Sequence, residues 1–201
     1  DYNISLVVTE GSCPSTVTTH TVHVDLTPTS DFTIDNPVCA GEDAIATYTG
    51  NAGVSATYYW DFDTATTSPA GQGPHTVNWD NDGIKYVNLT VVSQGCSSDN
   101  TVIPVTVNPT PPVPTITQAG NTLASSSTTN NQWYFNGSQI SGATGQFYTA
   151  TQSGFYQVEV TNSYGCSSIS DMLNVVVSGI NDAGFENSIS VFPNPNKGTF
   201  N

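Results

Sequence analysis

The chain has 201 residues, of which 16 are acidic and only two are basic, so its formal net charge is -14. Both basic residues are lysines, and arginine is absent. Binding to nucleic acid or to anionic membranes depends on Lys and Arg that pair with phosphate. The composition therefore excludes a nucleic-acid partner. It also argues against direct membrane insertion, because no run approaches the roughly 20 apolar residues of a membrane helix.

A repeated pattern surrounds three of the four cysteines. Leu6 precedes Cys13 by seven residues, as Leu89 precedes Cys96, and paired valines follow both cysteines at nine and eleven residues. Cys166 is followed by valines at the same two offsets. The cysteines are spaced by 83 and 70 residues, which indicates small domains in tandem. Such arrays present, space or anchor something else, so the repeat argues against a self-contained enzyme.

Alternating apolar residues predict β-strands along the whole chain, and no stretch shows a helical period. The predicted strands include Ile4–Val8, Tyr58–Phe62, Val87–Val91 and Ile103–Val107. The pair Asn136-Gly137 is the preferred sequence of a two-residue hairpin turn, because both positions accept positive φ. Short antiparallel strands with frequent turns predict an all-β fold of sandwiches.

Prolines set the predicted domain boundaries, because proline cannot continue a central strand. Pro28 lies in a Thr-Pro-Thr-Ser linker, and residues 108–114 hold four prolines in seven positions. The predicted segments are the C-terminal strands of a truncated domain (1–28), two complete sandwiches (29–110 and 111–178), and a linker with the start of another domain (179–201). An export signal, if any, is expected to belong to a longer parent protein.

The middle segment, 29–110, resembles a PKD domain, an immunoglobulin-like sandwich common in secreted bacterial proteins. The chain departs from the usual turn after Trp-Asp-Phe, since Asp63-Thr64-Ala65 stands where Gly-Asp-Gly is commonest. The residues that carry the resemblance are Tyr59-Trp60-Asp61-Phe62-Asp63, Gly73-Pro74-His75-Thr76-Val77-Asn78-Trp79, Gly83, Tyr86-Val87-Asn88-Leu89-Thr90-Val91 and Gly95-Cys96. The segment is therefore expected to be a PKD-like sandwich of a secreted protein.

The third segment, 111–178, is similar to the Ig-like domain found at the ends of large secreted proteins of the Bacteroidota. Its matching motifs are Gln132-Trp133-Tyr134-Phe135-Asn136-Gly137, Ile140-Ser141-Gly142-Ala143-Thr144, Gly154-Phe155-Tyr156-Gln157-Val158 and Gly165-Cys166-Ser167. The two resemblances together imply tandem immunoglobulin-like β-sandwiches joined by Pro-rich linkers.

The tail resembles the opening of the C-terminal sorting domain of type IX secretion cargo. The motif begins at Ile189-Ser190 and continues through Val191, Phe192, Pro193, Asn194, Pro195, Lys197 and Gly198. Only the first strand of that signal is present, so the C-terminus of the natural protein is expected further on. The resemblance implies recognition by the type IX machinery at the outer membrane and a secreted or cell-surface location.

The PKD-like resemblance makes Cys39 and Cys96 a disulfide pair, since both belong to one domain of an exported protein. Cys13 is expected to pair with a residue upstream of Asp1. Cys166 has no cysteine partner in its own segment and is expected to be a free or buried thiol. It is not interpreted as catalytic, because no basic group lies near it in sequence.

Three tryptophans have two interpretations, as core residues or as platforms for sugar rings. Trp60 and Trp133 occupy equivalent places before Cys96 and Cys166, where an Ig-like sandwich places its central tryptophan. The core interpretation is therefore preferred for both, and also for Trp79.

Acidic loops and one threonine are candidate sites. Asp61, Asp63, Asp80 and Asp82 lie in two loops of one segment, and carboxylates of this kind can hold Ca²⁺. The alternative is solvated acidic loops in a chain that is acidic throughout. Asp63-Thr64-Ala65 fits the acceptor pattern for O-glycosylation at Thr64 that many Bacteroidota use.

The histidines suggest no metal or catalytic site. His20 and His23 are three residues apart and so lie on opposite faces of a strand, while His75 stands alone. No serine lies in a strand-to-helix nucleophile elbow. No enzyme, no resident cofactor and no confident metal site are therefore predicted.

The first functional hypothesis is the non-catalytic C-terminal stalk and secretion-signal region of a large exported protein. The alternative is an adhesin or carbohydrate-binding module whose loops recognise surface polysaccharide or other cells. An exposed row of aromatic side chains would favour the second hypothesis, and buried aromatics the first. A hydrolase is a third class, assigned only to the missing parent.

Overall fold

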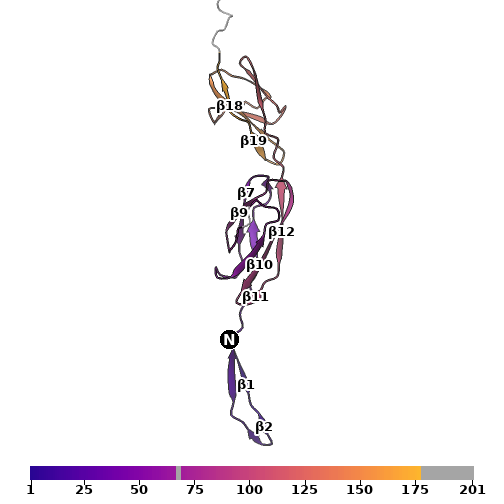
Figure 1. Ribbon diagram of the computed structural model, residues 1–201, viewed down its shortest axis with the longest axis vertical. Helices are drawn as coiled ribbons and strands as arrows, with labels where there is room; N and C mark the ends of the chain where they lie inside the picture. Colours follow the sequence, from indigo (N-terminus) through magenta and orange to yellow (C-terminus); the bar gives the residue numbers. More distant parts are fainter. Residues whose placement is uncertain (67–68, 178–201) are drawn as a thin grey trace, which may run out of the picture. The chain divides into compact units, whose positions relative to one another are not determined.

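The computed structural model describes residues 1–66 and 69–177. These residues form strands β1 to β20 and no helix (Figure 1). The chain divides into two compact units, Asp1–Thr110 and Pro111–Asn201, and the second is described as far as residue 177. The all-β fold predicted from the alternating pattern is confirmed.

The N-terminal part of the first unit is a two-stranded ribbon. Strand β1 (Tyr2–Leu6) pairs antiparallel with β4 (Thr18–Val22). Beyond them, β2 (Thr9–Glu10) pairs with β3 (Cys13–Pro14). Every residue of these four strands is exposed. Because side chains alternate between the two faces of a strand, the ribbon has one apolar and one polar face.

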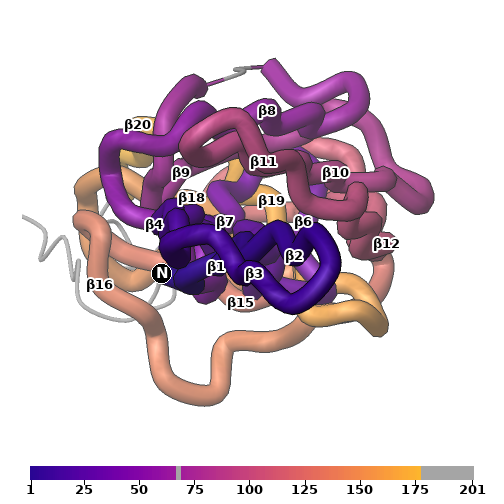
Figure 2. Tube along the Cα trace, turned by 90° about the horizontal axis from the view of Figure 1, so that it is seen from below, coloured from indigo at the N-terminus to yellow at the C-terminus, as the bar shows by residue number. Residues whose placement is uncertain are grey.

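The rest of the first unit is a sandwich of two sheets. One sheet has the order β5–β7–β9, formed by Phe32–Ile34, Asp43–Tyr48 and His75–Asn78. The other has the order β11–β10–β12–β6, formed by Cys96–Ser97, Gly83–Ser93, Thr101–Asn108 and Val38–Cys39. Strand β8 (Thr57–Asp61) pairs with the second edge of β10. Strands β8, β10 and β11 can be followed together in Figure 2.

Alternate residues of β10 form the centre of the first core. Val87, Leu89 and Val91 are fully buried there. They share one hydrophobic cluster with Ala44 and Ala46 of β7, in the facing sheet. The small alanines and the branched side chains opposite them let the two sheets pack closely. The described arrangement is therefore a β-sandwich, as the strand pattern predicts.

The ribbon reproduces the β10–β11–β12 part of this sandwich at an offset of 83 residues. The pairs Leu6↔Thr18 and Tyr2↔Val22 of the ribbon correspond to Leu89↔Thr101 and Lys85↔Val105 of the sandwich. All the other ribbon pairs follow the same offset, including those of β2 with β3. The spacing of Cys13 and Cys96 thus has a structural counterpart, because the repeat sets the same strand register twice.

Two hydrogen bonds are reproduced at the same offset. The Ser15 amide donates to the Val8 carbonyl at 2.7 Å, as the Ser98 amide donates to that of Val91 at 2.8 Å. The hydroxyl oxygens of Ser15 and Ser98 accept in return from the amides of Val8 and Val91, at 3.0 and 2.9 Å. The ribbon is therefore a second copy of one half of the sandwich.

The second unit is also built of two sheets. One has the order β13–β14–β17, formed by Ile116–Ala119, Thr122–Ser125 and Phe147–Thr149. The other has the order β16–β15–β18–β19, with β20 also on β18, formed by Ser138–Gln139, Asn131–Phe135, Gly154–Thr161, Ser167–Ile169 and Leu173–Val175. Its core contains Trp133, Tyr156 and Val158 from one sheet and Leu123 from the other.

The hairpin turn predicted at Asn136-Gly137 is confirmed. Phe135 of β15 pairs with Ser138 of β16, which leaves a two-residue loop. Both loop residues have positive φ, 48° and 78°. That combination matches the right-handed twist of the flanking strands, which explains why Asn-Gly is used.

Candidate functional site

The three tryptophans are used for packing. Trp79 and Trp133 are fully buried, and their indole N–H groups donate to the carbonyls of Phe62 and Gly145, both at 2.9 Å. Trp60 packs against the core of its unit and stacks on Phe62, with ring centroids 5.2 Å apart. The core interpretation of all three is confirmed, and none of them is a free platform for a sugar ring.

The predicted disulfide between Cys39 and Cys96 is wrong. Cys96 is a free, partly buried thiol at the start of β11, and Cys13, its equivalent in the ribbon, is a free, exposed thiol. Cys39 and Cys166 are the disulfide-bonded cysteines, so the expectation of a free thiol at Cys166 is also wrong. The pairing implied by the PKD-like resemblance failed because shared membership of a segment does not fix which sulfur atoms meet.

Alkylation of the unreduced protein should modify two cysteines per chain. We expect rapid labelling at Cys13, which is exposed, and slower labelling at Cys96, which is partly buried. Cys39 and Cys166 should react only after reduction. Peptide mass mapping after iodoacetamide treatment tests this result. A peptide linked through Cys39 and Cys96 would contradict it.

The four aspartates proposed as calcium ligands do not form one site. No three His, Cys, Asp or Glu side chains of the described residues gather in a way that could hold a metal ion. The Asp61 carboxylate instead accepts the Asp63 amide at 2.9 Å, and that of Asp63 accepts the Tyr86 amide at 3.2 Å. These carboxylates satisfy backbone donors next to β8 and β10, so the calcium hypothesis is not supported.

Thr64 lies in the exposed turn that follows β8. Its hydroxyl oxygen accepts a hydrogen bond from the Lys85 ammonium at 3.3 Å. O-glycosylation at this residue stays a prediction. The predicted sorting residues, Val191 to Gly198, lie outside the described residues.

The three histidines differ in their burial and contacts. His75 is buried, lies edge-on to Trp60, and its Nε2 is 3.0 Å from the Gly71 carbonyl oxygen, so it belongs to the core. His20 is exposed on β4. His23 lies between two carboxylates, with Nδ1 2.5 Å from Asp1 and Nε2 2.9 Å from Asp25.

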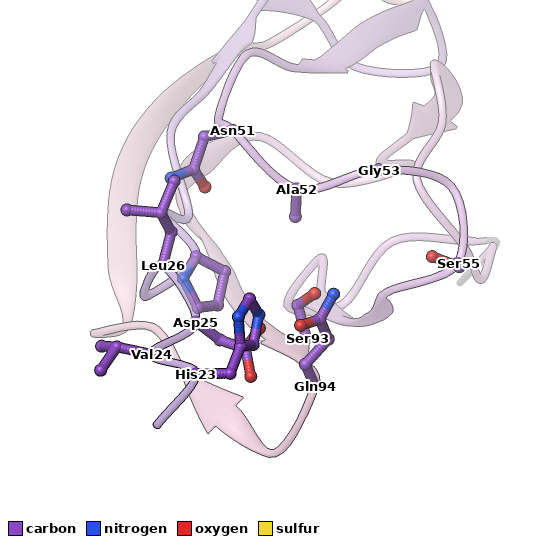
Figure 3. A pocket seen from close by; sticks show the side chains of 11 residues that line it. His23, Val24, Asp25, Leu26, Asn51, Ala52, Gly53, Ser55, Ser93 and Gln94 are labelled. Carbon is purple, nitrogen blue, oxygen red and sulfur yellow. The ribbon is translucent and has the colours of Figure 1, made fainter. Parts of the chain in front are cut away.

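A hollow in the first unit lies beside the segment that follows the ribbon (Figure 3). His23, Asp25, Asn51 and Gln94 contribute polar groups to its lining. The amide of Asn51 is already used, because it accepts from the Thr29 amide at 2.9 Å and donates to the Thr27 carbonyl at 3.2 Å. The contacts fix the path of the linker, and we assign no ligand to this hollow.

The outer face of β10 and β12 carries an apolar surface that sequence reasoning missed. Ile84, Tyr86, Val102 and Pro104 are all exposed there, and we call them the outer patch. Tyr86 is directly opposite Pro104 in the strand register, and Ile84 and Val102 lie at neighbouring positions of the same face. Clustered exposed apolar side chains on a monomer commonly mark an interaction surface.

The ribbon shows that the fold does not require apolar residues at the outer patch. The equivalent positions, at the offset of 83, hold Asp1, Asn3, Thr19 and Thr21. Polar side chains on this face form hydrogen bonds across the two strands. The Thr21 hydroxyl donates to the amide oxygen of Asn3 at 2.8 Å, and the hydroxyl oxygens of Ser5 and Thr19 are 3.2 Å apart. Comparison of the two repeats at these positions was the sequence signal that could have revealed the patch.

On the second unit, the outer face of β15 and β18 carries a polar pair. The hydroxyl of Tyr134 donates to a carboxylate oxygen of Glu159 at 2.6 Å. This hydrogen bond is the main cause that raises the pKa of Tyr134, and partial burial and the negative charge of Glu159 add to it. The pair joins neighbouring strands across the face, where Tyr134 is opposite Gln157 and Glu159 is opposite Gln132.

We expect Glu159→Gln to lower the pKa of Tyr134 toward its ordinary value near 10. Because the folded-state pKa is raised, the stabilisation by this pair is complete below the unfolded-state pKa and is lost as pH rises through the folded-state pKa. Loss of the bond in Tyr134→Phe should cost about 1 kcal/mol. NMR titration of the Tyr134 ring carbons measures the shift, with Glu10→Gln as a control for the loss of one charge. An unchanged Tyr134 titration in Glu159→Gln would contradict the assignment.

None of the described residues forms a helix with the length and apolar character needed to cross a membrane.

No family model and no curated protein matches this chain. It is similar to a structure described as "Structural basis for the promiscuous specificity of the carbohydrate-binding modules from the beta-sandwich super family", at 17% identity and a TM-score of 0.37 over 69% of this chain and 60% of that chain. The Bacteroides ovatus mixed-linkage glucan utilization locus SGBP-B, in complex with mixed-linkage heptasaccharide, is 15% identical with a TM-score of 0.31 over 88% of this chain and 47% of that chain.

The tandem Ig repeats of Dlar are 15% identical, with a TM-score of 0.27 over 76% of this chain and 95% of that chain. This chain spans less than two thirds of the length of the first two structures. At these identities and TM-scores the likeness carries no inference about this chain.

Proposed function

We propose that this chain is the non-catalytic C-terminal stalk and secretion-signal region of a large exported protein, and that this protein is cargo of the type IX secretion system. The observation that carries the proposal is that all three tryptophans pack in or against the cores of the two units. Trp79 and Trp133 are buried in separate sandwich cores. Modules of this kind act as folded spacers that resist proteolysis. Residues 191–198 of the tail act as the sorting signal.

The polar surface chemistry also supports an extracellular spacer. Thr is the commonest residue at the exposed positions of the described strands, and it suits β-strand surfaces. A net charge of -14 opposes association between copies and binding to anionic surfaces. The proposed location is therefore the cell surface or the medium, and the proposed partner is the transport machinery at the outer membrane.

A secretion assay tests the addressing role. A passenger is fused to the region from Gly179 to the C-terminus of the natural protein, and a matched fusion ends at Ser188. In a host with the type IX system, we expect only the first passenger in the medium. The proposal is wrong if both passengers reach the medium equally, or if the first one does so in a host that lacks this system.

A second candidate function, binding of polysaccharide, is favoured by the outer patch. The ring of Tyr86 is exposed beside Pro104, and Asn88 lies between Asp61 and Val102 on the same face. A sugar ring presents C–H groups on one face and hydroxyl groups at its rim. It could therefore stack on the tyrosine while the amide and carboxylate bond its hydroxyls. The acidic surroundings favour an uncharged glycan.

This candidate places recognition on a sheet face, whereas the sequence pointed to loops. Native gels that contain neutral polysaccharides should retard the wild-type chain and should not retard Tyr86→Ala. Phe147→Ala is the matched control, because Phe147 is an exposed aromatic residue on a different sheet. Equal retardation of both variants, or no retardation of the wild type by any neutral glycan, would exclude the outer patch as a glycan site.

A further inference from the structure

The apolar face of the ribbon has no cover among the described residues. Ile4, Leu6 and Val8 are 60%, 63% and 60% exposed. Their equivalents at the offset of 83 residues are the three central core residues of β10, each 0% exposed. Val22 and Val24 of the ribbon are exposed as well, whereas their equivalents on β12 are buried. One set of positions is thus core in one copy and surface in the other.

The sandwich shows what covers these positions. The facing sheet, β5–β7–β9, supplies Ala44, Ala46 and Val77 to the same cluster as Leu89. Strand β8 pairs with residues 88–92 of β10, on the edge of β10 that does not pair with β12. The ribbon strand β1 pairs only with β4 among the described residues, so its equivalent edge offers unpaired backbone groups.

We propose that the apolar face and open edge of the ribbon form a docking surface for the first half of a sandwich module. That half has the strand pattern of β5, β7, β8 and β9. Its last strand leads into β1 of the ribbon, as β9 leads into β10 in the sandwich. The inference is independent of the proposed secretion role, because it rests on strand register and burial.

The chemistry of the ribbon selects this occupant. Strand addition at the β1 edge satisfies main-chain donors and acceptors, and side-chain pockets for alternate residues give specificity. The incoming edge strand must place apolar side chains on the inner face, as Tyr58 and Trp60 do on β8. On the opposite face of the ribbon, Asn3 and Thr21 already bond each other, so that face needs no cover.

A fusion tests the proposal. A second copy of residues 29–83, carrying Cys39→Ser, is joined directly to Asp1 of the full chain, which reproduces the natural connection between Gly83 and Ile84. We expect the backbone amides of Val7 and Thr9, the equivalents of residues 90 and 92 that pair with β8, to exchange at least about 100-fold more slowly than in the unfused chain. The added copies of Trp60 and Trp79 should show the blue-shifted fluorescence of buried indole.

Two variants of the fusion make the result specific. Leu6→Asp should restore fast exchange of the ribbon amides, because it places a charge on the covered face. Ser5→Asp should leave the protection intact, because Ser5 lies on the polar face opposite Thr19. The proposal is overturned if the unmodified fusion exchanges like the unfused chain, or if the added tryptophans stay solvent-exposed. Equal protection in the Leu6→Asp fusion would overturn it too.

Discussion

Leu89→Ala should lower the free energy of unfolding of the first unit by about 2–5 kcal/mol, the usual cost of removing a buried leucine side chain. Leu89 is fully buried between the two sheets, opposite Trp60 on β8 and Thr101 on β12. Because small domains have roughly 5–15 kcal/mol of net stability, the variant should lose a large fraction of the stability of this unit. A urea titration followed by the NMR signals of the Val87 and Val105 methyl groups measures the loss.

The chain contains its own control for this experiment. Leu6 is the equivalent residue of the ribbon and is exposed. Leu6→Ala should therefore change the same unfolding free energy by no more than about 0.5 kcal/mol. Similar losses for the two substitutions would show that Leu6 is covered in solution.

Trp133→Ala should unfold the second unit while the first stays folded. The side chain is completely buried, stacks near Tyr148 with ring centroids 5.9 Å apart, and donates its indole N–H to the Gly145 carbonyl. Loss of a buried tryptophan costs about 3–5 kcal/mol, and a carbonyl is left without its donor. Hydrogen exchange at the Val158 amide reports on the second unit and should approach the rate of an unfolded chain.

Tyr164→Ala is the surface control for Trp133→Ala, since Tyr164 is an exposed aromatic residue of the same unit. It should leave Val158 exchange unchanged. The core role assigned to Trp133 would be contradicted if Val158 stayed equally protected in Trp133→Ala.

Local patterns predicted the strands well because each one depends on neighbouring residues. The alternation of Val87, Leu89 and Val91 predicted a half-buried strand in the first unit. In the second unit, Asn136-Gly137 predicted the turn between β15 and β16, because both positions accept positive φ. The offset of Cys13 and Cys96 likewise predicted a repeat that strand registers reproduce.

Long-range chemistry was predicted less well. The partner of a cysteine depends on which Cβ atoms meet in the fold, which the sequence does not show. The PKD-like resemblance implied a bond between Cys39 and Cys96, whereas Cys96 is free. Asp61, Asp63, Asp80 and Asp82 were candidate calcium ligands because sequence spacing does not show whether carboxylates meet in space. The outer patch was missed because Ile84 and Tyr86 alternate out of phase with the core residues of the same strand.

Mass analysis of the natural protein recovered from outside the cell tests the central claim most directly. Peptide mapping of the secreted or surface fraction would locate both the sandwich units and the C-terminal end of the mature chain. We predict that peptides from residues 29–177 are present in this fraction and that peptides containing Val191 to Gly198 have been removed. Recovery of the protein only from inside the cell, with Pro193-Asn194-Pro195 intact, would contradict the stalk and sorting role.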